Sequence, residues 1–152
     1  MPFICKICEK CPTSHSLFKF EETPERIIYY TRPSNATNNE TDGIIQHYDG
    51  VLSEMNGKDW IWILDLNGFG MKNFMEIGNG IALARLITEK FSEHLQKIIV
   101  INQNAFTSAI YAIVKPFLSE SVQKLVVFPP FPPLEKVEPN HSNCNRESNI
   151  SS

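Results

Sequence analysis

A seven-residue run at 60–66, Trp-Ile-Trp-Ile-Leu-Asp-Leu, limits the folds open to this chain more than any other segment. Six of its seven residues are apolar, and they fall on both sides of the alternation that a β-strand presents. A strand that is apolar on both faces is typical of a parallel sheet whose faces are both covered by other elements. The run therefore predicts a central strand in an α/β protein.

Strand and helix patterns alternate around this run. Three further segments are rich in β-forming residues and predict strands: 27–31, 98–101 and 125–128. Three segments predict helices from their apolar spacing and capping residues: 44–55, 73–91 and 105–114. Asn73 and Glu76 form the capping pair that begins the second of these helices. The order β-α-β-α-β-α-β predicts a three-layer α/β fold, with a mainly parallel β-sheet flanked by helices.

Length, charge and hydropathy exclude several classes of protein. The chain has 152 residues, which suits one domain, and its net charge of -3 gives no general attraction to nucleic acid or to an anionic surface. We therefore expect no nucleic-acid partner. No apolar stretch approaches the ~20 residues needed to cross a bilayer. The first residues lack the features of a secretory signal, so we expect a cytoplasmic protein.

The composition divides the chain into three parts. Residues 1–23 form an N-terminal segment that contains three cysteines, and residues 24–128 hold the alternating strands and helices. Residues 129–152 form a tail that begins with four prolines in five positions and then becomes polar. Because proline disfavours both helix and central strand, we expect the tail to be extended first and then disordered.

Three blocks of the central part carry a family resemblance. Residues 63–70 are similar to a strand that ends in Asp-Leu-x-Gly, and residues 91–102 to Tyr-Pro-Glu-Arg-Leu-x-Lys followed by a strand and Asn. Residues 115–128 are similar to Lys-Pro-Phe-Leu, a short spacer, Lys and a closing strand. In this order and spacing the blocks resemble the CRAL-TRIO lipid-binding family, of the phosphatidylinositol-transfer and retinaldehyde-binding type. The resemblance implies a CRAL-TRIO-like fold over residues 24–128.

The resemblance also implies a function and a site. It implies non-catalytic binding of a small hydrophobic ligand, such as a phosphoinositide, in an apolar pocket under a gate helix, with transfer between membranes through transient contact with their surfaces. By position, the gate residues are Phe106, Ile110, Val114 and Phe117. The strands supply candidates for the pocket floor: Ile61, Ile63, Ile99, Ile101 and Val126. Glu93 and Lys124 match the positions that bind a phosphoinositide head group.

A rival interpretation is an interaction module whose pocket has collapsed. The sequence departs from the family pattern at 102–104 and after residue 128, where the proline-rich tail replaces the usual closure. Residues 129–133 suit a polyproline helix that a protein partner binds in an aromatic groove, although such a segment also serves as a stiff spacer. A connected apolar cavity of ~300 Å³ or more would favour a ligand, and a filled core would favour the module.

Metal and enzyme chemistry have weaker support in the sequence. Cys5, Cys8, Cys11 and His15 carry ligand types that zinc prefers, but four ligands in so short a segment leave little freedom of geometry, and reduced thiols are the simpler interpretation. We therefore expect no cofactor. No pairing of nucleophile and base is visible, and Asp65, at the end of the central strand, is expected to act as a structural hydrogen-bond acceptor.

Overall fold

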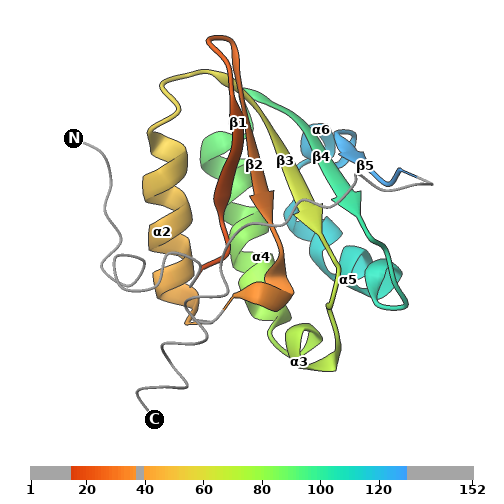
Figure 1. Cartoon of the computed structure of the whole chain (residues 1–152). Coiled ribbons are helices and arrows are strands. Elements are labelled where there is room, and N and C mark those ends of the chain that lie inside the picture. Colours follow the sequence, from red (N-terminus) through yellow and green to blue (C-terminus); the bar gives the residue numbers. More distant parts are fainter. Residues whose placement is uncertain (1–14, 37–39, 130–152) are drawn as a thin grey trace, which may run out of the picture.

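The fold is built on a five-stranded, mostly parallel sheet (Figure 1). It is seen in a computed structural model that describes residues 15–36 and 40–129. The strands lie in chain order across the sheet: β1 (Phe18–Glu22), β2 (Arg26–Thr31), β3 (Asp59–Asp65), β4 (Leu95–Ile101) and β5 (Val126–Val127). β1 pairs antiparallel with β2, and all other pairs are parallel. The predicted central position of β3 and the α/β fold class are confirmed.

Helices form the connections between the parallel strands. β2 leads into the 3-10 turn η1 (Pro33–Asn35) and then α2 (Thr41–Ser53). Between β3 and β4 lie α3 (Met71–Phe74), α4 (Ile77–Leu86) and the π-helical turn η2 (Ile87–Phe91). Between β4 and β5 lie α5 (Thr107–Val114), the 3-10 turn η3 (Lys115–Phe117) and α6 (Glu120–Gln123). None of these helices is long and apolar enough to cross a membrane.

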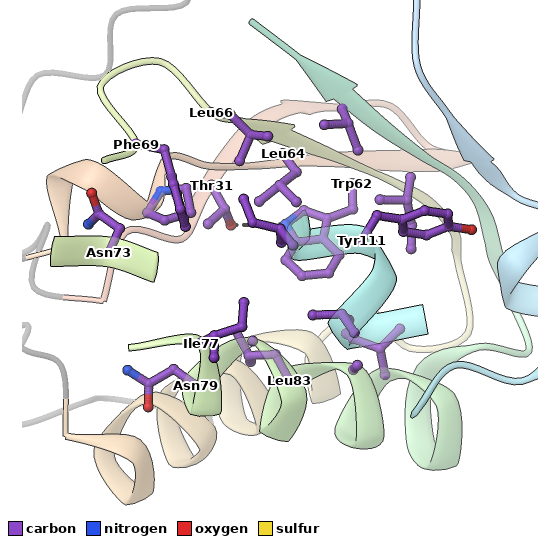
Figure 2. A pocket seen from close by; sticks show the side chains of 18 of the residues that line it. Thr31, Trp62, Leu64, Leu66, Phe69, Asn73, Ile77, Asn79, Leu83 and Tyr111 are labelled. Atoms are coloured by element: carbon purple, nitrogen blue, oxygen red, sulfur yellow. Dashed lines mark hydrogen bonds between the residues drawn. The ribbon is translucent and has the colours of Figure 1, made fainter. Parts of the chain in front are cut away.

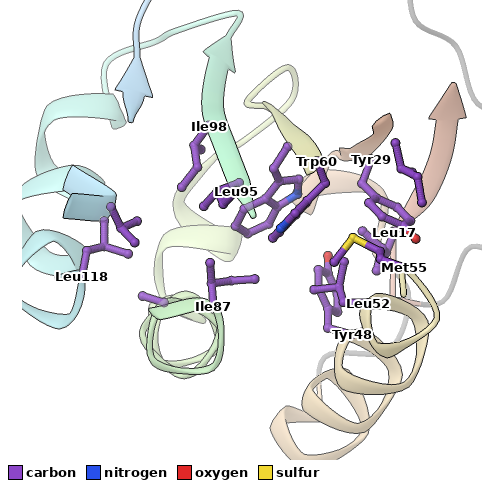
Figure 3. Close-up of a cluster of buried hydrophobic side chains, with 14 of the residues drawn as sticks. Leu17, Tyr29, Tyr48, Leu52, Met55, Trp60, Ile87, Leu95, Ile98 and Leu118 are labelled. Carbon is purple, nitrogen blue, oxygen red and sulfur yellow. The ribbon is translucent and has the colours of Figure 1, made fainter. Parts of the chain in front are cut away.

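The described helices pack on one face of the sheet. Each parallel strand is added beside the one before it, so right-handed crossovers place every connection on the same side. The main core lies between these layers, where Trp60 and Tyr29 of the sheet meet Leu52 of α2 and Ile87 of η2 (Figure 3). A smaller cluster on the opposite face is centred on Tyr30, Ile63 and Ile101. Residues 15–36 and 40–129 thus form two layers, a sheet and one layer of helices.

Three features differ from the sequence predictions. The helices do not flank both faces of the sheet, as the predicted three-layer arrangement required, because successive crossovers in the strand order β1-β2-β3-β4-β5 place the described helices on one face. The strand β1 was not predicted, because Phe-Lys-Phe-Glu-Glu carries more charge than apolar character; it is an edge strand joined to β2 by a tight turn in which Thr23 N donates to Arg26 O (2.8 Å). The helix predicted over 73–91 is interrupted between α3 and α4. Asn73 does not begin a helix, because its Oδ1 atom accepts a hydrogen bond from Gly70 N (3.0 Å), one turn earlier.

A buried polar cluster joins the carboxyl ends of β2, β3 and β4. Asp65 is 1% exposed and its Oδ2 atom lies 3.0 Å from Arg32 Nη2, with Arg32 itself only 8% exposed. The Tyr30 hydroxyl donates to the same carboxylate oxygen, and Asn102 Nδ2 (2.8 Å) and Asn67 N (2.9 Å) donate to Oδ1. Burial alone would raise the pKa of Asp65, but these hydrogen bonds and the Arg32 charge lower it overall. Asp65 is thus the structural acceptor that was expected.

We predict that Asp65→Asn destabilises the fold by about 3 kcal/mol or more, because it leaves the Arg32 guanidinium buried without a counter-charge. Urea unfolding of the two proteins measures the difference. Asp49→Asn is the matched control, since it removes a carboxylate from an exposed pair with Lys90 and is expected to cost less than ~1 kcal/mol. Equal losses in the two variants would contradict the role given to Asp65.

Candidate functional site

An apolar cavity of about 180 Å³ lies between the sheet and the helices (Figure 2). The sheet contributes one wall, formed by Thr31, Trp62, Leu64, Ile98 and Val100. Helices α4 and α5 contribute much of the opposite wall, through Gly80, Leu83, Ala84, Ile110 and Val114. The cavity is smaller than the ~300 Å³ that would mark a ready-made ligand site, but the core is not filled.

The sheet wall makes few hydrogen-bonding demands on a ligand. Trp62 Nε1 donates to Thr31 Oγ1 (2.9 Å), and Thr31 Oγ1 lies 3.1 Å from the Tyr48 hydroxyl. The Tyr48 hydroxyl in turn donates to the carbonyl of His15 (3.2 Å). Because these polar atoms satisfy one another, the wall presents mainly apolar surface to the cavity.

Four of the five predicted floor residues lie on the other face of the sheet. Ile63 and Ile101 belong to the small cluster on that face with Ile99, and Ile61 shares the alternation of Ile63 along β3. Only Val126 lines the cavity, and the floor consists of the residues that alternate with the predicted ones. A usable signal was present, because Asp59 and Lys97 share the face of the four isoleucines and mark it as the less covered one.

The gate residues divide into two pairs. Ile110 and Val114 of α5 line the cavity, whereas Phe106 and Phe117 do not. The Phe106 ring packs against Phe74 and Phe69, with centroid distances of 5.6 and 6.0 Å. The Arg85 guanidinium lies 4.8 Å from the centre of the Phe117 ring. Phe106 and Phe117 therefore hold the two ends of the α5–η3 segment in place through their ring contacts. Ile110 and Val114, between them, face the cavity.

The sequence predicts that residues 102–104 cap the helix over 105–114, and Asn104 does fix the start of α5. Its Nδ2 atom donates to the carbonyls of Leu66 (3.1 Å) and Phe69 (3.2 Å), and its Oδ1 atom accepts from Phe106 N (2.9 Å). These bonds join the beginning of α5 to the loop after β3. The predicted cap is confirmed, and its bonds to the loop after β3 are what the sequence did not indicate.

The predicted head-group residues lie away from the cavity. The Glu93 side chain is 87% exposed, 3.5 Å from His94 Nε2, in the turn before β4. Lys124 lies in a separate shallow hollow with Tyr111, Lys115, Glu120 and Gln123. Neither residue lines the apolar cavity.

The polar end of the cavity was also missed. Asn73, Glu76 and Asn79 line the cavity where α3 meets α4. Figure 2 shows Asn73 and Asn79 at the same end, with Tyr111 at the opposite one. From the sequence, Asn73 and Glu76 were assigned to helix capping alone.

His15 is buried beside a second histidine. Its ring centre lies 4.9 Å from that of His47 on α2, and His15 also lines the cavity. Burial lowers the pKa of His15, and burial together with the neighbouring His15 lowers the pKa of His47 to about 4. Cys5, Cys8 and Cys11 fall outside the described residues. Within the described part of the chain, no three metal-ligating side chains lie together.

We predict that His47 makes the fold less stable in mild acid. Since the unfolded chain binds a proton near pH 6.5 and the folded chain only near pH 4, stability falls by up to about 1.4 kcal/mol per pH unit as the pH drops between these values. His47→Gln removes this proton uptake, so its free energy of unfolding changes less steeply with pH. Denaturant unfolding at a series of pH values measures the slope. His94→Gln, at a partly exposed site, is the control, and identical slopes for wild type and His47→Gln would refute the prediction.

Comparison with known proteins gives a family and a fold. Residues 19–130 match the CRAL/TRIO domain. No curated protein sequence matches the chain significantly. The structure is similar to the crystal structure of Sfh5, with a TM-score of 0.59 and 12% sequence identity. This similarity covers 74% of the present chain and 47% of Sfh5, so the chain spans about half the length of that protein.

The two findings agree with each other. At 12% identity the likeness to Sfh5 shows the fold alone, and that fold is the CRAL-TRIO-like arrangement of a mostly parallel five-stranded sheet with helices. The domain match extends over most of the chain, from β1 to the end of the described residues. The chain belongs to the CRAL/TRIO domain family.

Proposed function

We propose that this protein binds one small hydrophobic ligand, or the apolar part of a larger amphiphile, in the cavity between the sheet and helices α4 and α5. CRAL/TRIO domains typically bind small hydrophobic ligands and are generally non-catalytic. The observation that carries the proposal is the composition of the cavity wall, where Thr31, Tyr48 and Trp62 satisfy one another. An apolar ligand displaces no hydrogen bond from such a wall, and each buried CH₂ group contributes roughly 0.8 kcal/mol.

The size of the cavity limits what it holds without rearrangement. A dry apolar cavity of about 150 Å³ is enough for a ligand the size of benzene. The space of about 180 Å³ therefore suits a ring or a short alkyl segment. A longer chain requires an outward movement of the wall, and we propose that α5 is the part that moves. Ile110 and Val114 would then leave the cavity, with Phe106 and Phe117 at the ends of the moving segment.

We propose that ligand exchange takes place at a membrane surface in the cytoplasm, where an open α5 finds an apolar environment. A phosphoinositide is a less favoured ligand, since Glu93 and Lys124 lie outside the cavity. We retain residues 24–128 as the proposed ligand-binding domain, with β1 added to its sheet. The proline-rich tail is a proposed site for a protein partner, and it falls almost entirely outside the described residues.

We predict that Ala84→Leu weakens the binding of toluene, a purely apolar probe, by at least about tenfold. Ala84 is buried on α4 and lines the cavity, so a larger side chain there occupies the space that the probe needs. Isothermal titration calorimetry on the full chain measures the affinity. We expect the stability of the ligand-free variant to be maintained, because the new methyl groups fill a void.

The matched control is Ala112→Leu, the same substitution at an exposed position of α5 that does not line the cavity. It should leave toluene binding unchanged. If the wild-type protein binds no toluene although it is folded, the cavity does not take ligands, and the interaction-module interpretation is favoured instead.

A further inference from the structure

The two ends of the cavity differ in chemistry. Asn73, Glu76 and Asn79 line it near the junction of α3 and α4, and Tyr111 lies at the far end (Figure 2). The Tyr111 ring packs edge-on against Phe128, with a centroid distance of 5.3 Å, and both residues line the cavity. The amide and carboxylate groups favour the polar part of a ligand at the α3–α4 end, and the two aromatic rings favour its apolar part at the far end.

Two groups at the polar end are available to a ligand. Asn73 Oδ1 accepts a hydrogen bond from Gly70 N (3.0 Å), which leaves its Nδ2 atom as a donor. Glu76 lies between α3 and α4 and is partly exposed. Within residues 15–36 and 40–129, neither Asn73 Nδ2 nor the Glu76 carboxylate has a hydrogen-bond partner. The polar end thus offers one neutral donor and one charged acceptor.

The charges around this end are mainly negative. Thr41 Oγ1 donates to Asn79 Oδ1, and this bond places the first turn of α2, which contains Asp42, next to the start of α4. Lys72 of α3 is a basic residue of the same region. The amino end of α4 contributes a partial positive charge of roughly half a unit, but Glu76 is the N-cap residue of that helix and carries a full negative charge.

These observations discriminate between polar head groups. A carboxylate or phosphate would approach Glu76 as a like charge and would lose its hydration. An ammonium group could donate to Glu76 but could not accept from Asn73 Nδ2. A hydroxyl group does both, because it is a donor and an acceptor.

Resting on the function proposed above, we infer that the α3–α4 end of the cavity selects a neutral, hydroxyl-bearing amphiphile over an anionic one. The hydroxyl donates to the Glu76 carboxylate and accepts from Asn73 Nδ2, and the apolar part extends toward Tyr111. Glu76 and Asn73 are thus specificity-determining residues of the cavity.

The test is calorimetric titration of the full chain with octanol and with octanoate at neutral pH. Any apolar cavity prefers the alcohol, so the informative quantity is the change in the ratio of the two affinities. Glu76→Gln removes the negative charge and is expected to shift the ratio at least about tenfold toward octanoate. Asn73→Asp keeps the acceptor for Gly70 N, removes the donor and adds a charge, so it should shift the ratio in the opposite direction. Glu89→Gln, an exposed site of η2 outside the cavity lining, has the same charge change as Glu76→Gln and should shift nothing.

The outcomes separate this inference from the proposed function. If the wild-type protein binds toluene and octanol but Glu76→Gln leaves the affinity ratio unchanged, the head-group assignment is overturned and the proposed function stands. The head-group assignment is overturned in the same way if Glu89→Gln shifts the ratio as much as Glu76→Gln. If the folded protein binds neither toluene nor octanol, both proposals fail.

Discussion

The arrangement of this molecule depends on one buried carboxylate. Asp65 ends the central strand at a point where its charge is almost completely removed from water, and such a charge persists only when it is paired and hydrogen-bonded. Arg32 supplies the counter-charge from the end of β2, and Asn102 supplies a hydrogen bond from the end of β4. Asn102 has a φ of 55°, the left-handed conformation that asparagine tolerates better than most residues. These contacts hold the carboxyl ends of the parallel strands β2, β3 and β4 together.

The segment that follows the carboxyl end of β4 also positions the cavity. The chain leaves the Asp65 cluster at Asn102 and reaches Asn104 two residues later, where hydrogen bonds to the loop after β3 fix the start of α5. The cluster lies on one face of the sheet and the cavity on the other, because side chains alternate along β3. Trp62 and Leu64 thus face α4 and α5, while Ile63 and Asp65 face away. The strands β2, β3 and β4 therefore provide the Asp65 cluster on one face of the sheet and the apolar cavity wall on the other.

The sequence predicts the elements of this fold well and the details of its site poorly. Runs of β-forming residues identified the four parallel strands, apolar spacing and capping residues identified the main helices, and three motif blocks identified the family. The edge strand β1 was missed because charged residues at an exposed edge give little apolar signal. The wrong face of the sheet was chosen because strands such as 60–66 are apolar on both sides. The charged residues Asp59, Asp65 and Lys97, which lie on the face of the predicted floor residues, distinguished the faces. The polar end of the cavity was overlooked because Asn73 and Glu76 also fit a helix cap, and three-dimensional packing alone shows that they line a cavity.

The cavity between the sheet and helices α4 and α5 is proposed to hold a hydrophobic ligand. Native mass spectrometry of the purified protein after incubation with a mixed lipid extract tests this proposal most directly, with lipid analysis of whatever remains bound. We expect a stoichiometric and selective adduct that Ala84→Leu abolishes. A folded wild-type protein that carries no adduct would rule out ligand binding in this cavity and would favour a role in protein interaction.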